Sequence, residues 1–337
     1  MRRLIAILAL SLLIYQLVNI TTSSANNAES VIVVVTFSYL KPDVERLLCG
    51  GVVYAIVPPG VDPHDYQLKP SDLDILRRAD LVISTGHTAF EIAIKELARR
   101  GELKALVLDM VDDLNLTLRV NPTTKQVNYH MPINDPANYL VFLSRVVELL
   151  STIDRENRAC YYERFHQVVS ALASRILVYQ GVFKGGKVVV DKPHVQYLVE
   201  WLGLEVVQIF KAEEGYQVTP QDVKAVEDLM RRGEVNIVVI TEPADSPEAS
   251  RLIELARAHG VPVVKVASPA SDKGVFNNLE LTITQVKERF KLASSVGQEG
   301  EVGVDRSLSL LVTISVLSVV LGLIVGYYIG VRRAGAR

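Results

Sequence analysis

An alternation of short β-branched runs with helical stretches, which occurs twice, constrains this chain more than any other feature of its sequence. Each occurrence holds four strand-like runs with three helical stretches between them. The strand-like runs lie at residues 31–36, 52–57, 80–84, 105–109, 187–191, 205–209, 235–240 and 262–267. Such apolar runs are typical of strands buried on both faces, and strands that alternate with helices predict a parallel sheet wrapped by helices. We therefore expect an α/β protein with two βα lobes.

A long helical stretch separates the two alternating regions. Residues 135–180 contain almost no glycine or proline. Within them, residues 155–179 would extend about 37 Å as one helix, which is longer than an ordinary domain helix. We expect the first lobe at residues 26–150, a connecting spine helix at 151–183 and the second lobe at 184–292, with a cleft between the lobes.

The beginning of the chain has the features of a secretory signal. Arg2 and Arg3 precede an apolar run, and a stretch of small residues that ends at Ala25 follows it. This order predicts a signal peptide over residues 1–25. A retained N-terminal anchor is the alternative, which Gln16 disfavours because a polar residue shortens the apolar run below a comfortable membrane span.

A second apolar segment, at residues 309–331, contains no charged residue. A helix of this length extends about 35 Å, which is enough to cross a bilayer with some tilt. Arginines follow it directly, and positively charged flanks stay on the cytoplasmic side. We expect a flexible linker at 293–308, a transmembrane helix at 309–331 and a cytoplasmic tail at 332–337, so that the bulk of the chain lies outside the cell membrane.

Charge and cysteine content narrow the remaining classes. The net charge of −2 provides no basic field for nucleic acid. Cys49 and Cys160 lack the spacing of metal ligands, and an extracytoplasmic location would permit a disulfide between them. The sequence leaves open whether they pair, and it leaves the oligomeric state open as well.

Four histidines lie where loops from the predicted sheets could line the cleft. His64 lies in a loop rich in proline and glycine after the second strand, and His87 follows the third. His130 precedes the long helical stretch, and His194 begins the helix after the first strand of the second lobe. Open α/β sheets bind ligands at the carboxyl ends of strands, and several imidazoles with a carboxylate suit zinc, whereas more carboxylates favour manganese. We expect a divalent metal site, although an isolated histidine in a turn is more often a plain surface residue.

The loop at residues 57–68 resembles a signature of the metal-binding solute-binding proteins of zinc and manganese ABC transporters. Its core is Asp62-Pro63-His64, and the resemblance extends from residue 31 to about residue 292. It implies two βα lobes joined by a long rigid helix, with His64 as the first metal ligand. It also implies a second ligand at His130, which stands shortly before a Pro-x-Asn element that opens a helix.

The second lobe departs from the pattern of that family. The position of the third ligand holds Lys192, and the fourth falls near Ser268 or at Asp272. Either His194 and Asp272 have replaced these ligands, with His87 in reserve, or the second lobe supplies none. We favour the first alternative, with Lys192 turned outward, because an ammonium group would repel a divalent cation.

These observations lead to one functional hypothesis with three alternatives. The hypothesis is a membrane-anchored receptor that captures zinc or manganese, delivers it to an ABC transporter permease and catalyses no reaction. The alternatives are a receptor or sensor of the same fold with a degenerate metal site, an adhesin-like surface protein, and a metallohydrolase with Glu213 or Glu214 as its base. No motif in the sequence supports the hydrolase.

Overall fold

The computed structural model describes residues 30–213, 215–244 and 246–296. The predicted signal peptide, the predicted transmembrane helix at 309–331 and the predicted cytoplasmic tail lie outside these residues. Within the described ranges, no helix is both long enough and apolar enough to cross a membrane. The described residues from Val31 onward belong to one compact unit.

The first lobe is built on a parallel four-stranded sheet in the order β2-β1-β3-β4. Its elements are β1 (Ile32–Phe37), η1 (Ser38–Leu40), α2 (Lys41–Leu47), β2 (Val52–Val57), α3 (Pro70–Arg78), β3 (Leu81–Ser84), α4 (Ala89–Arg99), β4 (Leu106–Asp109) and α5 (Met110–Asp113). The central strand β1 is buried along almost its whole length, as its run of β-branched residues predicts. The second and third strands lie on either side of it.

The second lobe repeats this topology in the order β10-β9-β7-β8. Its elements are β7 (Lys187–Val190), α8 (His194–Glu200), β8 (Glu205–Ile209), α9 (Pro220–Arg231), β9 (Ile237–Glu242), α10 (Pro247–Ala258), β10 (Val263–Ala267) and α11 (Val275–Val296). The first strand of the lobe, β7, is again central and has the second and third strands as neighbours. The two sheets with their helices confirm the expected α/β fold.

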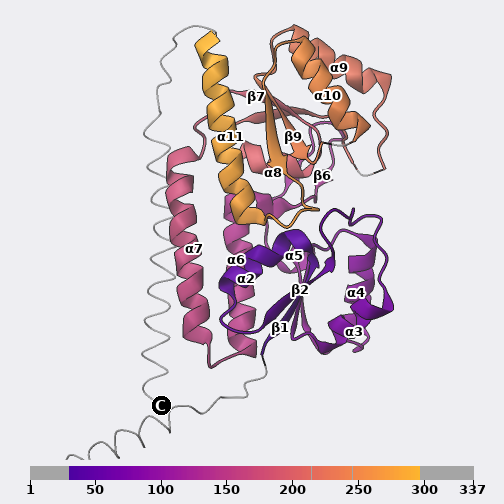
Figure 1. The fold of residues 1–337 in the computed structure, drawn as a ribbon, viewed down its shortest axis with the longest axis vertical. Coiled ribbons are helices and arrows are strands. Elements are labelled where there is room, and N and C mark those ends of the chain that lie inside the picture. The colour runs from indigo at the N-terminus through magenta and orange to yellow at the C-terminus, as the bar shows by residue number, and fades with distance from the viewer. Residues whose placement is uncertain (1–29, 214, 245, 297–337) are drawn as a thin grey trace, which may run out of the picture. The chain divides into compact units, whose positions relative to one another are not determined.

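Two long helices, α6 (Pro136–Ile153) and α7 (Arg158–Tyr179), follow the first lobe and pack side by side (Figure 1). The chain reverses between them at Asp154, whose carboxylate accepts hydrogen bonds from the Asn157 backbone N–H at 3.2 Å and the Tyr161 hydroxyl at 2.8 Å. The helix expected at residues 151–183 is therefore shorter: residues 151–153 belong to α6, and α7 begins at Arg158 and ends at Tyr179.

A buried carboxylate attaches the first lobe to α11. Asp43 accepts hydrogen bonds from the backbone N–H groups of Val275 and Phe276 at 2.6 and 3.1 Å, and from the Tyr139 hydroxyl at 2.6 Å. Burial raises the pKa of Asp43 although these hydrogen bonds act in the opposite direction. The carboxylate satisfies N–H groups that the first turn of a helix leaves without an intrahelical partner.

A disulfide joins Cys49, after α2, to Cys160 in α7, with 6.1 Å between the two Cα atoms. The pairing that the sequence left open is therefore present, and it attaches the first lobe to α7. At the end of the described region, α11 continues to Val296, so the first four residues of the linker predicted at 293–308 are helical instead. The helix continues because no glycine or proline interrupts the sequence before Gly297.

A short antiparallel hairpin of β5 (Arg119–Val120) and β6 (Val127–Asn128) was not predicted. Two-residue strands are too short to show the alternating pattern by which strands are recognised in a sequence. The hairpin contacts the second lobe, because the Asn121 side chain donates to the Ala212 carbonyl at 2.8 Å. It leads directly to His130 and so determines where that side chain lies.

Candidate metal site

His64 lies in the irregular loop after β2. Its backbone N–H donates to the Asp62 carboxylate at 2.9 Å, and its Nδ1 lies 3.1 Å from the same oxygen. The hydrogen bond with His64 is the main reason that the pKa of Asp62 falls to about 2. The ionised carboxylate accepts the Nδ1 proton, which leaves Nε2 as the ligand nitrogen, an arrangement common among metal-binding histidines. From the second lobe, Ala270 holds the loop by accepting the Gly60 N–H at 2.7 Å.

His87 lies in the loop between β3 and α4. Its Nδ1 is 2.9 Å from the Thr85 hydroxyl, which donates to the buried Glu91 carboxylate at 2.7 Å. A hydroxyl that donates to a carboxylate accepts from the imidazole, so Nδ1 carries the proton and Nε2 is again the ligand nitrogen. Burial raises the pKa of Glu91, but the charge of His87 and the hydrogen bonds of the threonine hydroxyls lower it overall. Gly86 is required in this turn, because a Cβ there would lie 2.2 Å from a carboxylate oxygen of Asp109.

His130 lies between the hairpin and η2 (Pro132–Asn134). Its backbone N–H donates to Oδ1 of Asn128 at 3.0 Å, and its Nδ1 is 3.2 Å from that oxygen. The amide nitrogen of Asn128 donates to the Pro193 carbonyl at 2.9 Å, which fixes the orientation of the amide. Burial, followed by the charges of His87 and His64, lowers the pKa of His130 to about 3. The imidazole is therefore neutral at physiological pH, as a metal ligand must be.

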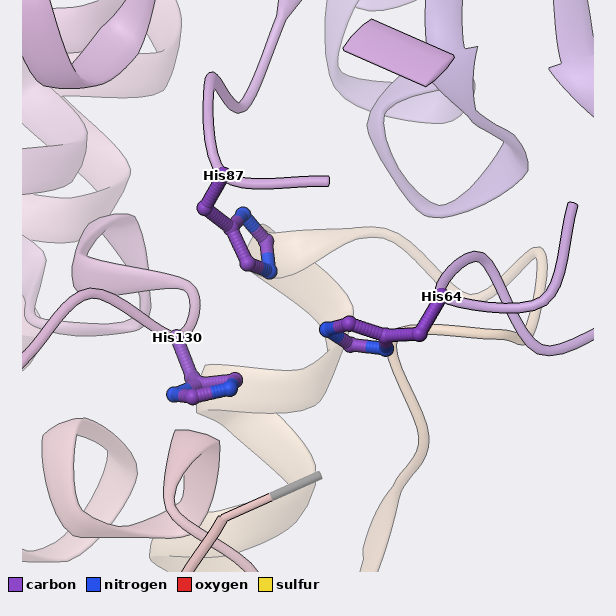
Figure 2. A group of neighbouring side chains, drawn as sticks. All are labelled: His64, His87 and His130. Atoms are coloured by element: carbon purple, nitrogen blue, oxygen red, sulfur yellow. The ribbon is translucent and has the colours of Figure 1, made fainter. Parts of the chain in front are cut away.

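The three imidazoles converge on one point (Figure 2). Their ring centroids are 5.3 Å apart for His64 and His87, 5.8 Å for His64 and His130, and 5.3 Å for His87 and His130. One ligand atom from each ring lies within 4.8 Å of the others. Each Nδ1 has an oxygen partner within the chain, so the geometry presents three Nε2 atoms to one ion. Three histidines are a common protein ligand set for zinc.

His194 contributes to the same cavity but not to this group. Its Nε2 lies 3.2 Å from the Thr241 hydroxyl, which donates to the buried Asp191 carboxylate at 3.0 Å. The hydroxyl therefore accepts the Nε2 proton of His194, and that nitrogen is occupied within the second lobe. Burial, followed by the charge of Lys192, lowers the pKa of His194 well below its usual value. The arrangement does not support the expectation that His194 points a nitrogen at the ion.

Asp272 and Lys192 also differ from what we expected. Asp272 is exposed in the loop before α11, and among the described residues the group of converging ligand atoms does not include it. We expected Lys192 to face outward, but it lines the cavity, and its charge contributes to the low pKa of Asp62. Ser268 and Ser271 line the same cavity, so Lys192 lies in a cavity with other polar residues.

The cavity has a volume of about 530 Å³ and is lined by residues of both lobes. His64, His87 and His130 lie on one side, and Lys192, His194 and Asp272 belong to the other lobe. All four histidines that the sequence placed near the cleft line this cavity, as expected. A metal ion would fill only a small part of such a volume.

Sequence reasoning gave two residues less weight than the structure does. We expected His87 only in reserve, although its position at the carboxyl end of a strand was the same signal that identified His64. Glu213 entered only as a base for a hydrolase, yet its carboxylate lies 3.7 Å from His130 Nε2. Glu213 also lies in a loop after the carboxyl end of a strand, four residues beyond the end of β8 at Ile209, and that position could have identified it.

Comparison with known proteins gives a consistent result. The model of the family described as "Zinc-uptake complex component A periplasmic" (ZnuA) matches residues 33–288. The chain is 23% identical over 280 residues to the iron-binding protein YfeA of Yersinia pestis, covering 80% of this chain and 88% of that protein. It is 24% identical over 227 residues to the manganese ABC transporter substrate-binding lipoprotein PsaA of Streptococcus pneumoniae, covering 63% and 72% of the two chains.

The solved structures show a similar fold. The Zn(II)-bound AdcAII mutant variant of Streptococcus pneumoniae superposes with a TM-score of 0.64 at 17% identity, covering 78% of this chain and 99% of that one. At this level of identity the likeness concerns the fold and leaves the ligand set of this chain to its own residues. The metals named for the relatives differ, so the metal of this chain has to be argued from its site.

Proposed function

The chain belongs to the ZnuA family of periplasmic zinc-uptake components, and from this premise we propose that it captures a divalent metal ion with His64, His87 and His130 and delivers it to an ABC transporter permease. The family consists of binding components of metal uptake systems, so the chain is a substrate-binding protein and not an enzyme. The metal is its cargo.

The observation that carries the proposal is the convergence of the three imidazoles with each Nδ1 already bonded within the chain. Such bonds fix the ring orientation and the proton position before the ion arrives, which reduces the cost of ordering the ligands. Three nitrogen ligands favour zinc over manganese, because manganese prefers carboxylate, carbonyl and water oxygens. We therefore propose zinc as the principal cargo and manganese as the weaker one.

We also propose that the receptor works outside the cytoplasm and is held at the membrane by residues 309–331. The uncharged sequence of that segment and the arginines beyond it support this topology. The relative PsaA is named a lipoprotein. A membrane helix in this chain would hold the receptor at the membrane, as a lipid does in a lipoprotein. Anchoring keeps the receptor at a high effective concentration near its permease.

The test is a metal titration of the full chain in detergent after removal of bound metal with a chelator. The unmodified protein should bind one Zn²⁺, and His64→Ala, His87→Ala and His130→Ala should each weaken the affinity at least tenfold, because each removes one ligand from the ion. His259→Ala is the matched control. That imidazole lies at the end of α10, 3.9 Å from Glu227 of α9, and does not belong to the converging group. Unchanged affinity in all three variants would contradict the proposal.

A further inference from the structure

Three imidazoles leave a divalent ion with an incomplete ligand set. Zinc in proteins is usually bound by four ligands in a tetrahedral arrangement. The converging group within the described residues consists of three imidazoles, none of which brings a negative charge to the ion. The position that supplies the third ligand in the resembling family holds Lys192, so a fourth ligand from the protein would come from another position of this chain.

Glu213 has the required donor atom close to the site. Its Oε2 lies 3.7 Å from Nε2 of His130. Two donor atoms that bind the same tetrahedral zinc ion with bonds of about 2.1 Å are roughly 3.4 Å apart. The observed separation is therefore close to that of two ligands on one ion. Glu213 does not yet lie within 4.8 Å of all three imidazole ligand atoms, so its carboxylate would turn toward His64 and His87 on metal binding.

The loop that carries Glu213 is fixed against the element that carries His130. The side chain of Asn121, which is fully buried in the hairpin, donates to the Ala212 carbonyl at 2.8 Å and lies 3.4 Å from Oε1 of Glu213. The Thr123 hydroxyl adds a hydrogen bond to the Ile209 carbonyl at 3.1 Å. These bonds hold the backbone next to Glu213 in place, so the approach of its carboxylate to His130 is a consequence of the fold.

The position of Glu213 in the second lobe corresponds to that of His64 in the first. His64 lies in the loop after β2, and Glu213 lies in the loop after β8, which is the second strand of a sheet with the same topology. Both loops follow the carboxyl ends of strands, where open α/β sheets place their ligand-binding groups. The two lobes would therefore meet at the ion through equivalent loops.

Three other carboxylates near the histidines each orient a neighbouring group of the chain. Asp62 holds His64, Asp191 accepts two hydrogen bonds from Thr241, and Glu91 accepts the hydrogen bonds of threonine hydroxyls. Each of these carboxylates orients another group and would leave it without its partner if it moved to the ion. The carboxylate of Glu213 also has a partner, the Asn121 amide at 3.4 Å, but 36% of its side chain is exposed, which leaves room for it to turn.

We propose that Glu213 is the fourth metal ligand, and that its carboxylate closes the second lobe on an ion held by three histidines of the first. This inference rests on the proposed function. It places the contribution of the second lobe in the loop after β8, instead of at the loops that contain Lys192 and Asp272. A ligand set of three nitrogens and one carboxylate oxygen keeps the preference for zinc and reduces the charge of the occupied site from +2 to +1.

The test compares Glu213→Gln with Glu227→Gln in the full chain. Glu227 is the matched control, because its carboxylate also lies near an imidazole, 3.9 Å from Nε2 of His259, but on the surface of the same lobe. Glu213→Gln should weaken Zn²⁺ binding at least tenfold and leave the unfolding temperature of the metal-free protein unchanged. Glu227→Gln should change neither quantity.

A second measurement distinguishes a ligand from a nearby charge. Co²⁺ bound in place of zinc has a visible absorption spectrum that depends on its ligands, and Glu213→Gln should shift that spectrum. Weaker binding with an unchanged Co²⁺ spectrum would overturn the assignment of Glu213 as a ligand. So would unchanged binding by Glu213→Gln when His64→Ala binds weakly, and in that case the proposed function would stand. Unchanged binding by both variants would overturn the proposed function as well.

Discussion

The two lobes of this protein share one sheet topology but contribute very differently to the cavity between them. In the first lobe, the loops after β2 and β3 and the segment after the hairpin direct three imidazoles to one point. In the second lobe, the loop after β7 contains Lys192 and an imidazole, His194, that is bonded to Thr241. Two sheets of the same topology therefore carry different side chains at the cavity, and the fold by itself does not decide which lobe holds the ion.

The difference also concerns how each lobe is held in place. The first lobe is attached to α7 by a disulfide and to α11 by Asp43. The second lobe reaches the site through the hydrogen bonds of the hairpin with the loop after β8. We infer that the first lobe is a rigid platform for the three histidines, and that the second lobe contributes one carboxylate whose side chain can turn toward the ion.

The largest loss in the free energy of unfolding should come from breaking the disulfide that attaches the first lobe to α7. Cys49→Ser with Cys160→Ser opens a link between residues 111 positions apart, and a crosslink over about 100 residues stabilises a fold by about 4.7 kcal/mol in the chain-entropy model. Denaturant unfolding of the oxidised protein and of the double variant should show this loss. A difference below about 1 kcal/mol would mean that the disulfide does not brace the first lobe.

The second largest effect should come from Asp43, which attaches the first lobe to α11. Asp43→Ala leaves the buried Tyr139 hydroxyl and the N–H groups at the start of α11 without their acceptor, and one such group costs about 1–3 kcal/mol. We expect a loss of about 3 kcal/mol in the free energy of unfolding. Asp74→Ala, which removes an exposed carboxylate of α3, should change the same quantity by less than about 0.5 kcal/mol.

Each lobe contains one buried histidine that makes the stability of the protein depend on pH, so the two lobes can be compared by this dependence. The pKa values of His130 and His194 are both lowered in the folded protein. In the unfolded chain these histidines have the usual pKa of about 6.5. Between that pH and their folded pKa values, the unfolded chain therefore binds protons that the native protein does not bind. The stability of the metal-free protein is therefore greatest above pH 6.5. It falls as the pH decreases, for His130 until about pH 3, with a loss of about 1 kcal/mol per group at pH 5.5.

Two variants assign this loss to a lobe. His130→Asn should remove part of the pH dependence in the first lobe, and His194→Gln should remove the part in the second. Urea unfolding at pH 7.5 and pH 5.5 measures both contributions. Equal pH dependence in the two variants and in the unmodified protein would show that neither histidine is responsible. The same protonation should release the metal in acid, because a ligand nitrogen has to be unprotonated.

The smallest effect, a change in Zn²⁺ affinity, should follow from substitution of Lys192, which lines the cavity from the second lobe. Lys192→Gln removes a positive charge from the surroundings of a divalent cation, and we expect Zn²⁺ affinity to rise about threefold at low salt and less at high salt. Lys265→Gln is the control, since that ammonium is paired with Glu242 on the surface. Weaker Zn²⁺ binding by Lys192→Gln would mean that this lysine supports the site, for example by keeping Asp62 ionised.

The sequence identified the converging residues of the first lobe more directly than it identified the contribution of the second lobe. His64 was assigned through the contiguous Asp62-Pro63-His64 element, which resembles the signature of a known family. His194 and Asp272 were assigned by default when the expected positions held other residues. That assignment could not foresee that the Thr241 hydroxyl, 47 positions away, would lie 3.2 Å from His194 Nε2.

The sequence by itself determined the two βα lobes, the long helix after the first lobe and the strand-end loops in which three histidines lie. It did so because strand burial, helix periodicity and turn residues are local properties of the chain. Only the tertiary structure decided that His87 joins His64 and His130, that His194 is bonded within its own lobe, and that Glu213 approaches His130. Those facts depend on distances between residues that are far apart in sequence, which arise from packing and leave no local pattern.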